Sequence, residues 1–144
     1  MKDQSYSALG LRIFGNDLDP GEISRLLGAL PSSSYRKGER FSTGGRLIRK
    51  TNAWIRDATD RRPDDLNSQI AEILDPLCQD LGVWAHLQAR FQLDLFAGLF
   101  MEEGYPGFTL SANAISLMAA RGLQLRACVY GTDTLDRQPP DPHL

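Results

Sequence analysis

The chain has 144 residues, a hydrophobic fraction of 42% and a formal net charge of −2 at pH 7. This length supports one hydrophobic core, and no apolar run approaches the roughly 20 residues needed to cross a bilayer. The first residues lack the features of a secretory signal, and Cys78 and Cys128 each lie in an apolar pattern. We therefore expect a cytoplasmic protein with two buried free thiols, no disulfide and no membrane association.

The first predicted elements are a strand over residues 9–13 and a helix over residues 20–27. Every second residue of the strand is apolar, which is the period of a half-buried strand. Asp19 has the side chain of a helix N-cap, a proline follows at the first helical position, and Glu22 completes a D-x-x-E capping box. Gly28 can adopt the left-handed conformation that ends a helix.

The position of the second strand stays open at this point. It is either Ala53–Ala58 or one side of a hairpin that pairs Arg46–Lys50 with Asn52–Asp57. Trp54 lies in the apolar window of a charged segment, so we predict that its ring is buried against the helix that follows. The glycine-containing stretch 42–46 lacks the full P-loop pattern and predicts a hairpin turn.

A long helix is predicted over residues 64–88, where apolar residues recur at steps of three and four. Asp64 or Asp65 has the side chain to cap its start. Pro76 removes a backbone hydrogen bond and clashes with the preceding turn, so we expect a kink or break near it. Asp75 is then expected to cap a second helical piece.

The C-terminal half repeats the order of the first half. A strand over residues 91–99 is apolar on much of both faces, which is typical of a central strand. Ser111 is the expected cap of a helix that Gly122 ends, and a last strand follows. Residues 18–26 and 110–118 share the pattern L-[D/S]-x-x-x-I-S-x-[L/M], for which duplication and chance similarity both stay open.

These elements predict an α+β fold. We expect two strand–helix–strand halves that form a mainly antiparallel sheet with helices on one face, ferredoxin-like in outline, and the long helix inserted between the halves. An open sheet with helices on both faces is the alternative. The domain is expected over residues 1–131, followed by a flexible tail over 132–144, which holds three prolines and almost no apolar residues.

Positive charge is concentrated in residues 36–62, which hold nine basic and three acidic residues and carry +6, while the remainder carries −8. Seven of the nine are arginines, which favour forked hydrogen bonds to carboxylates or phosphates. The segment is either a docking face for a partner or a solvated hairpin whose charges pair within the same protein. The candidate binding residues are Tyr35, Arg36, Lys37, Arg40, Arg46 and Arg49.

No catalytic constellation is recognisable in the sequence. His86 and His143 have no second ligand at metal spacing and no C-x-x-C motif occurs, so we predict no metal, no cofactor and no enzymatic activity. The expected function is that of a protein-binding module with an acidic protein partner, and the alternative is an anion- or nucleic-acid-binding domain. A pI of about 5.6 and few aromatic residues disfavour nucleic acid. The sequence fixes no oligomeric state.

Several motifs together resemble an uncharacterised bacterial domain-of-unknown-function family. They are I-F-G-x-x-L-D-P-x-x-I-S-x-x-L-G at residues 13–28, R-K-G-E at 36–39, Trp54, G-L-F at 98–100 and G-F-T-L-S at 107–111. The resemblance covers about residues 7–131. It implies small cytosolic proteins without established catalytic residues, some of which resemble immunity proteins that neutralise toxins. It transfers no site residue to this chain.

Overall fold

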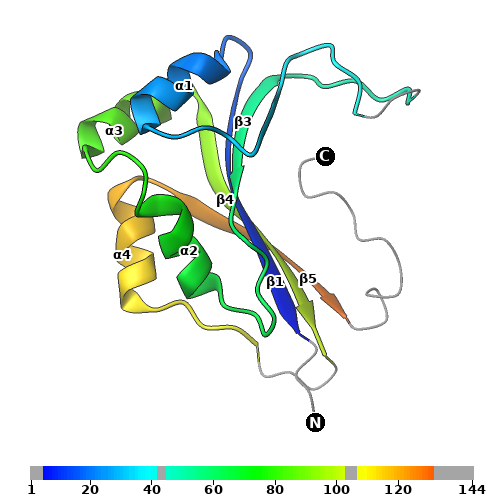
Figure 1. Ribbon diagram of the computed structural model, residues 1–144, viewed down its shortest axis with the longest axis vertical. Coiled ribbons are helices and arrows are strands. Elements are labelled where there is room, and N and C mark those ends of the chain that lie inside the picture. Colours follow the sequence, from blue (N-terminus) through cyan, green and yellow to red (C-terminus); the bar gives the residue numbers. More distant parts are fainter. Residues whose placement is uncertain (1–4, 42–44, 103–106, 132–144) are drawn as a thin grey trace.

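The computed structural model describes residues 5–41, 45–102 and 107–131 (Figure 1). Its elements are β1 (Tyr6–Gly15), α1 (Pro20–Leu27), β2 (Ser33–Tyr35), β3 (Asn52–Asp57), α2 (Leu66–Leu74), α3 (Leu81–Arg90), β4 (Gln92–Met101), α4 (Ala112–Ala120) and β5 (Gln124–Gly131). The predicted tail at 132–144 and most of the predicted turn at 42–46 lie outside the described ranges.

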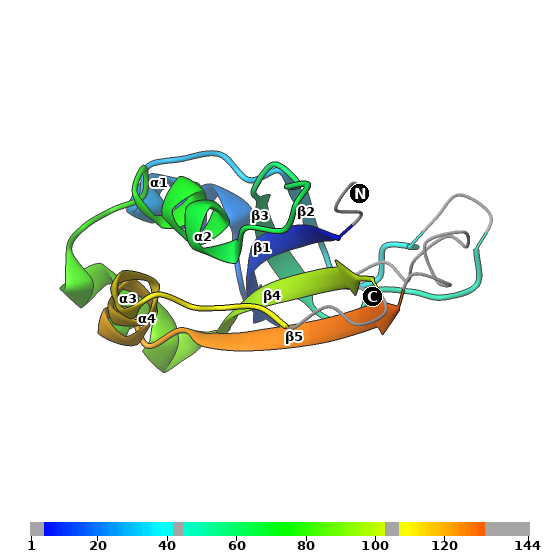
Figure 2. The same cartoon turned by 90° about the horizontal axis from the view of Figure 1, so that it is seen from below.

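The strands form one open sheet in the order β2-β3-β1-β4-β5. All neighbours are antiparallel except β4 and β5, which are parallel. The helices lie on the face that carries Leu9, Leu11 and Ile13 (Figures 1 and 2). The predicted α+β class and the mainly antiparallel sheet are therefore confirmed. The two predicted halves differ from each other, however. β1 and β3 pair antiparallel, whereas β4 and β5 pair parallel, so the sheet departs from a symmetric ferredoxin-like arrangement.

The start and the end of α1 follow the sequence prediction, while its capping box does not. The Asp19 carboxylate accepts a hydrogen bond from Gly21 N at 3.1 Å, and Gly28 has a left-handed φ of 78°. The Glu22 carboxylate does not close the box, because it lies 3.2 Å from Nη2 of Arg90 on α3. The residue that was expected to support the cap instead ties α1 to α3.

We predict that Asp19→Ala and Ser111→Ala each lower the free energy of unfolding by about 0.5–2 kcal/mol, the usual cost of losing an N-cap. Ser111 Oγ accepts a hydrogen bond from Ala114 N at 3.1 Å, so it caps α4 as Asp19 caps α1. Urea unfolding measures both losses. Asp17→Ala, at an exposed aspartate two residues before the cap, is the matched control and should unfold like wild type. Cap variants as stable as this control would contradict the assignment.

The predicted long helix is two helices, α2 and α3, separated at Pro76 as expected. Asp65 caps α2, in agreement with one of the two predicted alternatives. The cap of the second piece was predicted wrongly. Asp80 is the N-cap of α3 and accepts a hydrogen bond from Gly82 N at 2.8 Å, while Asp75 is the C-cap of α2. Within the described parts of the chain, no helix has the length and apolar character to span a membrane.

The second strand predicted from the sequence corresponds to β3. It pairs with β1 on one side and with the short strand β2 on the other. The alternative that paired it with Arg46–Lys50 is therefore wrong. Trp54 on β3 is fully buried, as predicted. Its indole N–H donates to Ser24 Oγ at 3.0 Å, so the helix that it binds is α1 rather than the predicted helix over 64–88.

Both cysteines are free thiols, as predicted. Neither is fully buried, which corrects the expectation from their apolar surroundings. Cys78 follows α2 in the loop to α3, where its carbonyl accepts the indole N–H of Trp84 at 2.8 Å. Cys128 lies on the edge strand β5. Each is half-buried because its element lies at the margin of the core.

Candidate functional site

The first part of the basic segment forms an arm that extends from the β2–β3 end of the sheet, away from the helices (Figure 1). Its two sides are residues 36–41 and 45–50, which we call the basic arm. Gly38 N donates to Arg49 O at 2.8 Å, and Phe41 N donates to Leu47 O at 3.2 Å. These backbone bonds continue the β2–β3 pairing beyond the sheet, so the arm is an ordered extension of the fold.

Arg49 supports the arm from within. Its guanidinium carbon lies 3.9 Å from the ring centroid of Tyr35 and 3.8 Å from that of Phe41. A cation between two aromatic rings is attracted by both ring faces. Two of the predicted binding residues, Tyr35 and Arg49, therefore hold the arm together, and the rings interleaved with the charges are occupied by this contact.

The remaining predicted binding residues lie exposed on the arm. Arg36 lies 3.7 Å from the Asp19 carboxylate, but both side chains are more than half exposed, at 60% and 57%, so the pair contributes little to stability. With six basic residues and one acidic residue, the arm carries a net charge of +5. Its exposed cations are Arg36, Lys37, Arg40, Arg46 and Lys50.

Two apolar side chains are exposed on the same arm. Leu47 is 65% exposed and Ile48 is 52% exposed, and both lie on the side of the arm that leads back to β3. Because neighbouring side chains of an extended segment point to opposite faces, each face of the arm exposes one apolar side chain among charged ones. The arm thus combines charge for attraction with apolar surface for burial.

The second part of the basic segment contacts neighbouring elements of the same protein, and Arg61 pairs with an acidic side chain there, as the alternative interpretation of the charges expected. Its arginines bind groups of neighbouring elements and stabilise the fold. The contacts are Arg56 Nη1 to Leu30 O at 2.7 Å, Arg61 Nη2 to Glu72 Oε1 at 2.8 Å, and the Arg62 guanidinium at 4.6 Å from the Tyr6 ring centroid. The basic segment, continuous in sequence, is therefore divided in the structure into an exposed arm and a set of arginines that contact other elements of the protein.

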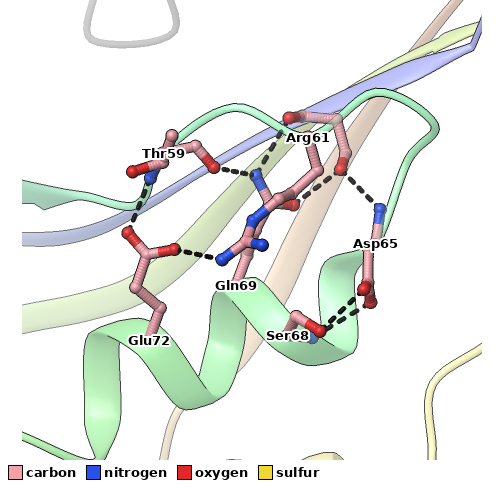
Figure 3. Close-up of polar contacts among 7 residues, drawn as sticks. Thr59, Arg61, Asp65, Ser68, Gln69 and Glu72 are labelled. Carbon is pink, nitrogen blue, oxygen red and sulfur yellow. Dashed lines mark hydrogen bonds and ion pairs between the residues drawn. The ribbon is translucent and has the colours of Figure 1, made fainter.

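Arg61 belongs to a polar network around the buried side chain of Gln69 (Figure 3). Gln69 Nε2 donates to the carbonyls of Ser7 and Thr59, at 2.9 and 3.0 Å, and its Oε1 accepts from Ser7 Oγ. Glu72 accepts from Thr59 N and from Arg61. Burial opposes the ionisation of Glu72, but these hydrogen bonds outweigh it and hold the pKa of Glu72 below its ordinary value. The network fixes the chain between β3 and α2.

The sequence interpretation missed a buried ion pair on the face of the sheet opposite the helices. Arg12 Nε and Nη2 donate to the two carboxylate oxygens of Asp94 at 2.8 and 2.7 Å. The Arg12 guanidinium also lies 4.4 Å from the Phe96 ring centroid and 5.2 Å from that of Phe14. The sequence does place Arg12 and Asp94 among the polar positions of two predicted strands. They are 82 residues apart in the chain, however, so nothing in the sequence shows that these two charges meet.

A cavity of about 490 Å³ opens beside this ion pair. Its walls come from the beginnings of β4 and β5 and from the ends of α3 and α4, and polar side chains contribute much of its lining: Gln88, Gln92, Gln124 and Arg126. His86 lies outside it, exposed on α3, with Nε2 3.2 Å from Arg90 Nη1. Across the described ranges, no group of three or more His, Cys, Asp or Glu residues is placed to hold a metal ion.

A sequence model of the family described as "Domain of unknown function (DUF4279)" matches residues 4–132. The matched range contains every element from β1 to β5 and the whole basic arm. No curated protein matches the chain, and no solved structure matches it. The family description names no activity, ligand or partner.

Proposed function

The chain belongs to the DUF4279 family, a domain of unknown function, and from this starting point we propose that it is a non-catalytic protein-binding module whose basic arm docks on an acidic protein. The observation that carries the proposal is the composition of the arm. Five exposed cations and two exposed apolar side chains, Leu47 and Ile48, share one protruding segment.

The exposed cations contribute little to the fold that carries them. Exposed ion pairs are each worth about 0–1 kcal/mol, and the pair of Arg36 with Asp19 is of this kind. The same cations attract an acidic surface and accelerate its association. Leu47 and Ile48 then supply the apolar area whose removal from water holds the complex together. Charge and apolar surface thus serve successive steps of docking.

Arg49 favours binding by ordering the arm in advance. Its contacts with Tyr35, at the end of β2, and with Phe41, near the tip of the arm, order the arm along its length before a partner arrives, which lowers the conformational entropy lost on association. The same contacts disfavour the nucleic-acid alternative, because single-stranded nucleic acids stack on free aromatic rings. Protein carboxylates are therefore the partner chemistry that the arm fits best.

A narrower form of the proposal takes an acidic toxin as the partner. An immunity-type protein neutralises its toxin by covering a functional surface, which needs complementary charge and apolar area but no catalytic residue. The protruding arm is a suitable element for such a contact, since it reaches beyond the body of the sheet (Figure 1).

Site-specific photocrosslinking in cell lysate, at low and at high salt, tests the proposal. We expect p-benzoylphenylalanine in place of Leu47 to capture an acidic protein, with capture reduced at high salt because screening weakens the attraction of the arm. The matched control carries the same group in place of Leu30, which is 75% exposed but lies outside the arm. Absence of an adduct at position 47, an adduct with nucleic acid, or equal capture of the same protein at position 30 would overturn the proposal.

A further inference from the structure

The outer edge of β5, over Gln124–Tyr130, is the longest strand edge in the described chain with which no described strand pairs. β5 has eight residues and pairs with β4 along its whole length, while no described strand pairs with its other side. Native proteins protect such edges by shortness, lysine, proline or a bulge. β2, at the opposite edge, has three residues. β5 has neither lysine nor proline and keeps a regular register with β4, so its edge is a template for another strand.

We propose that two copies of this chain pair through β5, antiparallel to each other, about a two-fold axis that passes through Cys128 perpendicular to the sheet. Residues directly opposite in an antiparallel pair point to the same face. A two-fold axis perpendicular to the sheet keeps the faces matched only when one residue lies opposite its own copy across the axis. The candidate registers are therefore centred on single residues of β5, and its side chains decide among them.

The one charged residue of β5 selects the register. An axis at Arg126 would place the two arginines opposite each other, which is destabilising. An axis at Cys128 places Arg126 opposite Tyr130 of the second copy, and Ala127 opposite Val129. An axis at Ala127 would place Arg126 opposite Cys128, with no ring to receive its charge. The register at Cys128 alone pairs the cation with an aromatic ring.

Tyr130 ends a row of stacked rings that crosses the sheet. Its ring centroid lies 4.9 Å from that of Phe100, which lies 4.2 Å from that of Tyr6, and Arg62 covers the far end of the row at 4.6 Å. In the proposed pair, Arg126 of the second copy approaches the Tyr130 end of this row. A cation then stands at each end of the stacked rings, an arrangement that their faces favour.

Pairing also buries apolar surface that is exposed in the single chain. Val129 is 60% exposed, and in this register its neighbour across the axis is Ala127. Because β2 and β3 lie at the opposite side of the sheet, pairing at β5 leaves both basic arms accessible. The inference stands independently of the proposed function, but a paired molecule would present two arms and bind a repeated partner with higher avidity.

Oxidative crosslinking of the full chain, combined with light scattering, tests both the pairing and its register. Diamide joins two thiols in one disulfide and takes up the two hydrogen atoms. We expect a crosslinked species of twice the 16.0 kDa chain mass that persists in Cys78→Ser and is lost in Cys128→Ser. Without oxidant, Cys128→Ser should still scatter as a dimer.

Val129→Lys should scatter as a monomer and lose the crosslink, since it places a charge on the pairing edge. Leu30→Lys, at another exposed apolar residue, is the matched control and should stay dimeric. Circular dichroism checks that the lysine variants are folded, and Ala127→Lys, at an exposed neighbour, replaces Val129→Lys if that variant unfolds. A monomeric wild type, or a dimer that does not crosslink through Cys128, would overturn the proposal.

Discussion

Asp94→Ala is expected to lower the free energy of unfolding by about 3–5 kcal/mol, the range for breaking a buried ion pair by removing one partner. Arg12 and Asp94 are 7% and 8% exposed, and two hydrogen bonds join the guanidinium to the carboxylate. Without the carboxylate, the arginine charge stays buried with its main counter-ion missing. Arg12 and Asp94 lie directly opposite each other on β1 and β4, and the guanidinium also lies over the rings of Phe14 and Phe96, which keep it largely away from water.

Urea unfolding at equilibrium measures this loss, and a double variant separates the ion pair from the space that it fills. Arg12→Met with Asp94→Leu replaces both charges by apolar side chains, which is often neutral or stabilising for a buried pair. We expect the double variant to recover much of the stability lost in Asp94→Ala. An Asp94→Ala protein within about 1 kcal/mol of wild type would show that the pair is hydrated, like an exposed one.

Trp54→Ala is expected to cost about 3–5 kcal/mol, the range for truncating a large core side chain. The ring is fully buried on β3 against α1, and a domain of this size has about 5–15 kcal/mol of stability in total. Thermal unfolding measures the effect. Ser24→Ala removes only the partner of the indole N–H and should cost about 1–3 kcal/mol, the penalty for a buried donor left unpaired. A Trp54→Ala protein that melts like wild type would show that the ring does not stabilise the core.

Local signals predicted the caps and the central strand because they depend on few neighbouring residues. Asp19, Asp65 and Ser111 each supply a side-chain acceptor for a free N–H within the first turn of the helix, which sequence alone can indicate. β4 was recognisable as central because apolar residues occupy much of both its faces. These features need no knowledge of which distant segment packs against them.

The length of the break between α2 and α3 was not predictable from periodicity. Leu77 lies in the connecting loop and is buried, so the apolar stripe continues across the break without a visible gap. Asp75 and Asp80 are equally suitable caps by residue type, and packing of the loop decides between them. The same limit applies to strand direction, since the sequence of β5 does not reveal that it runs parallel to β4.

The basic segment 36–62 was predicted to form one surface. In the structure, β3 divides it into two parts. The sequence locates the basic residues, but the strand that begins at Asn52 separates the exposed arm from Arg56, Arg61 and Arg62, which contact other elements. The ion pair of Arg12 with Asp94 was missed for a related reason. Both residues lie on the sheet face that alternation assigns to solvent, and only the pairing of β1 with β4 brings them together.

Charge reversal on the basic arm tests the central claim most directly. Affinity for the acidic protein captured at position 47 is compared between wild type, Arg40→Glu, and the control Arg25→Glu. The two variants change the net charge equally, and the control residue is exposed on α1, outside the arm. We predict that the arm variant loses binding, mainly through slower association, while it melts like wild type. An arm variant that binds as tightly as wild type, or a control that loses binding to the same extent, would contradict the claim.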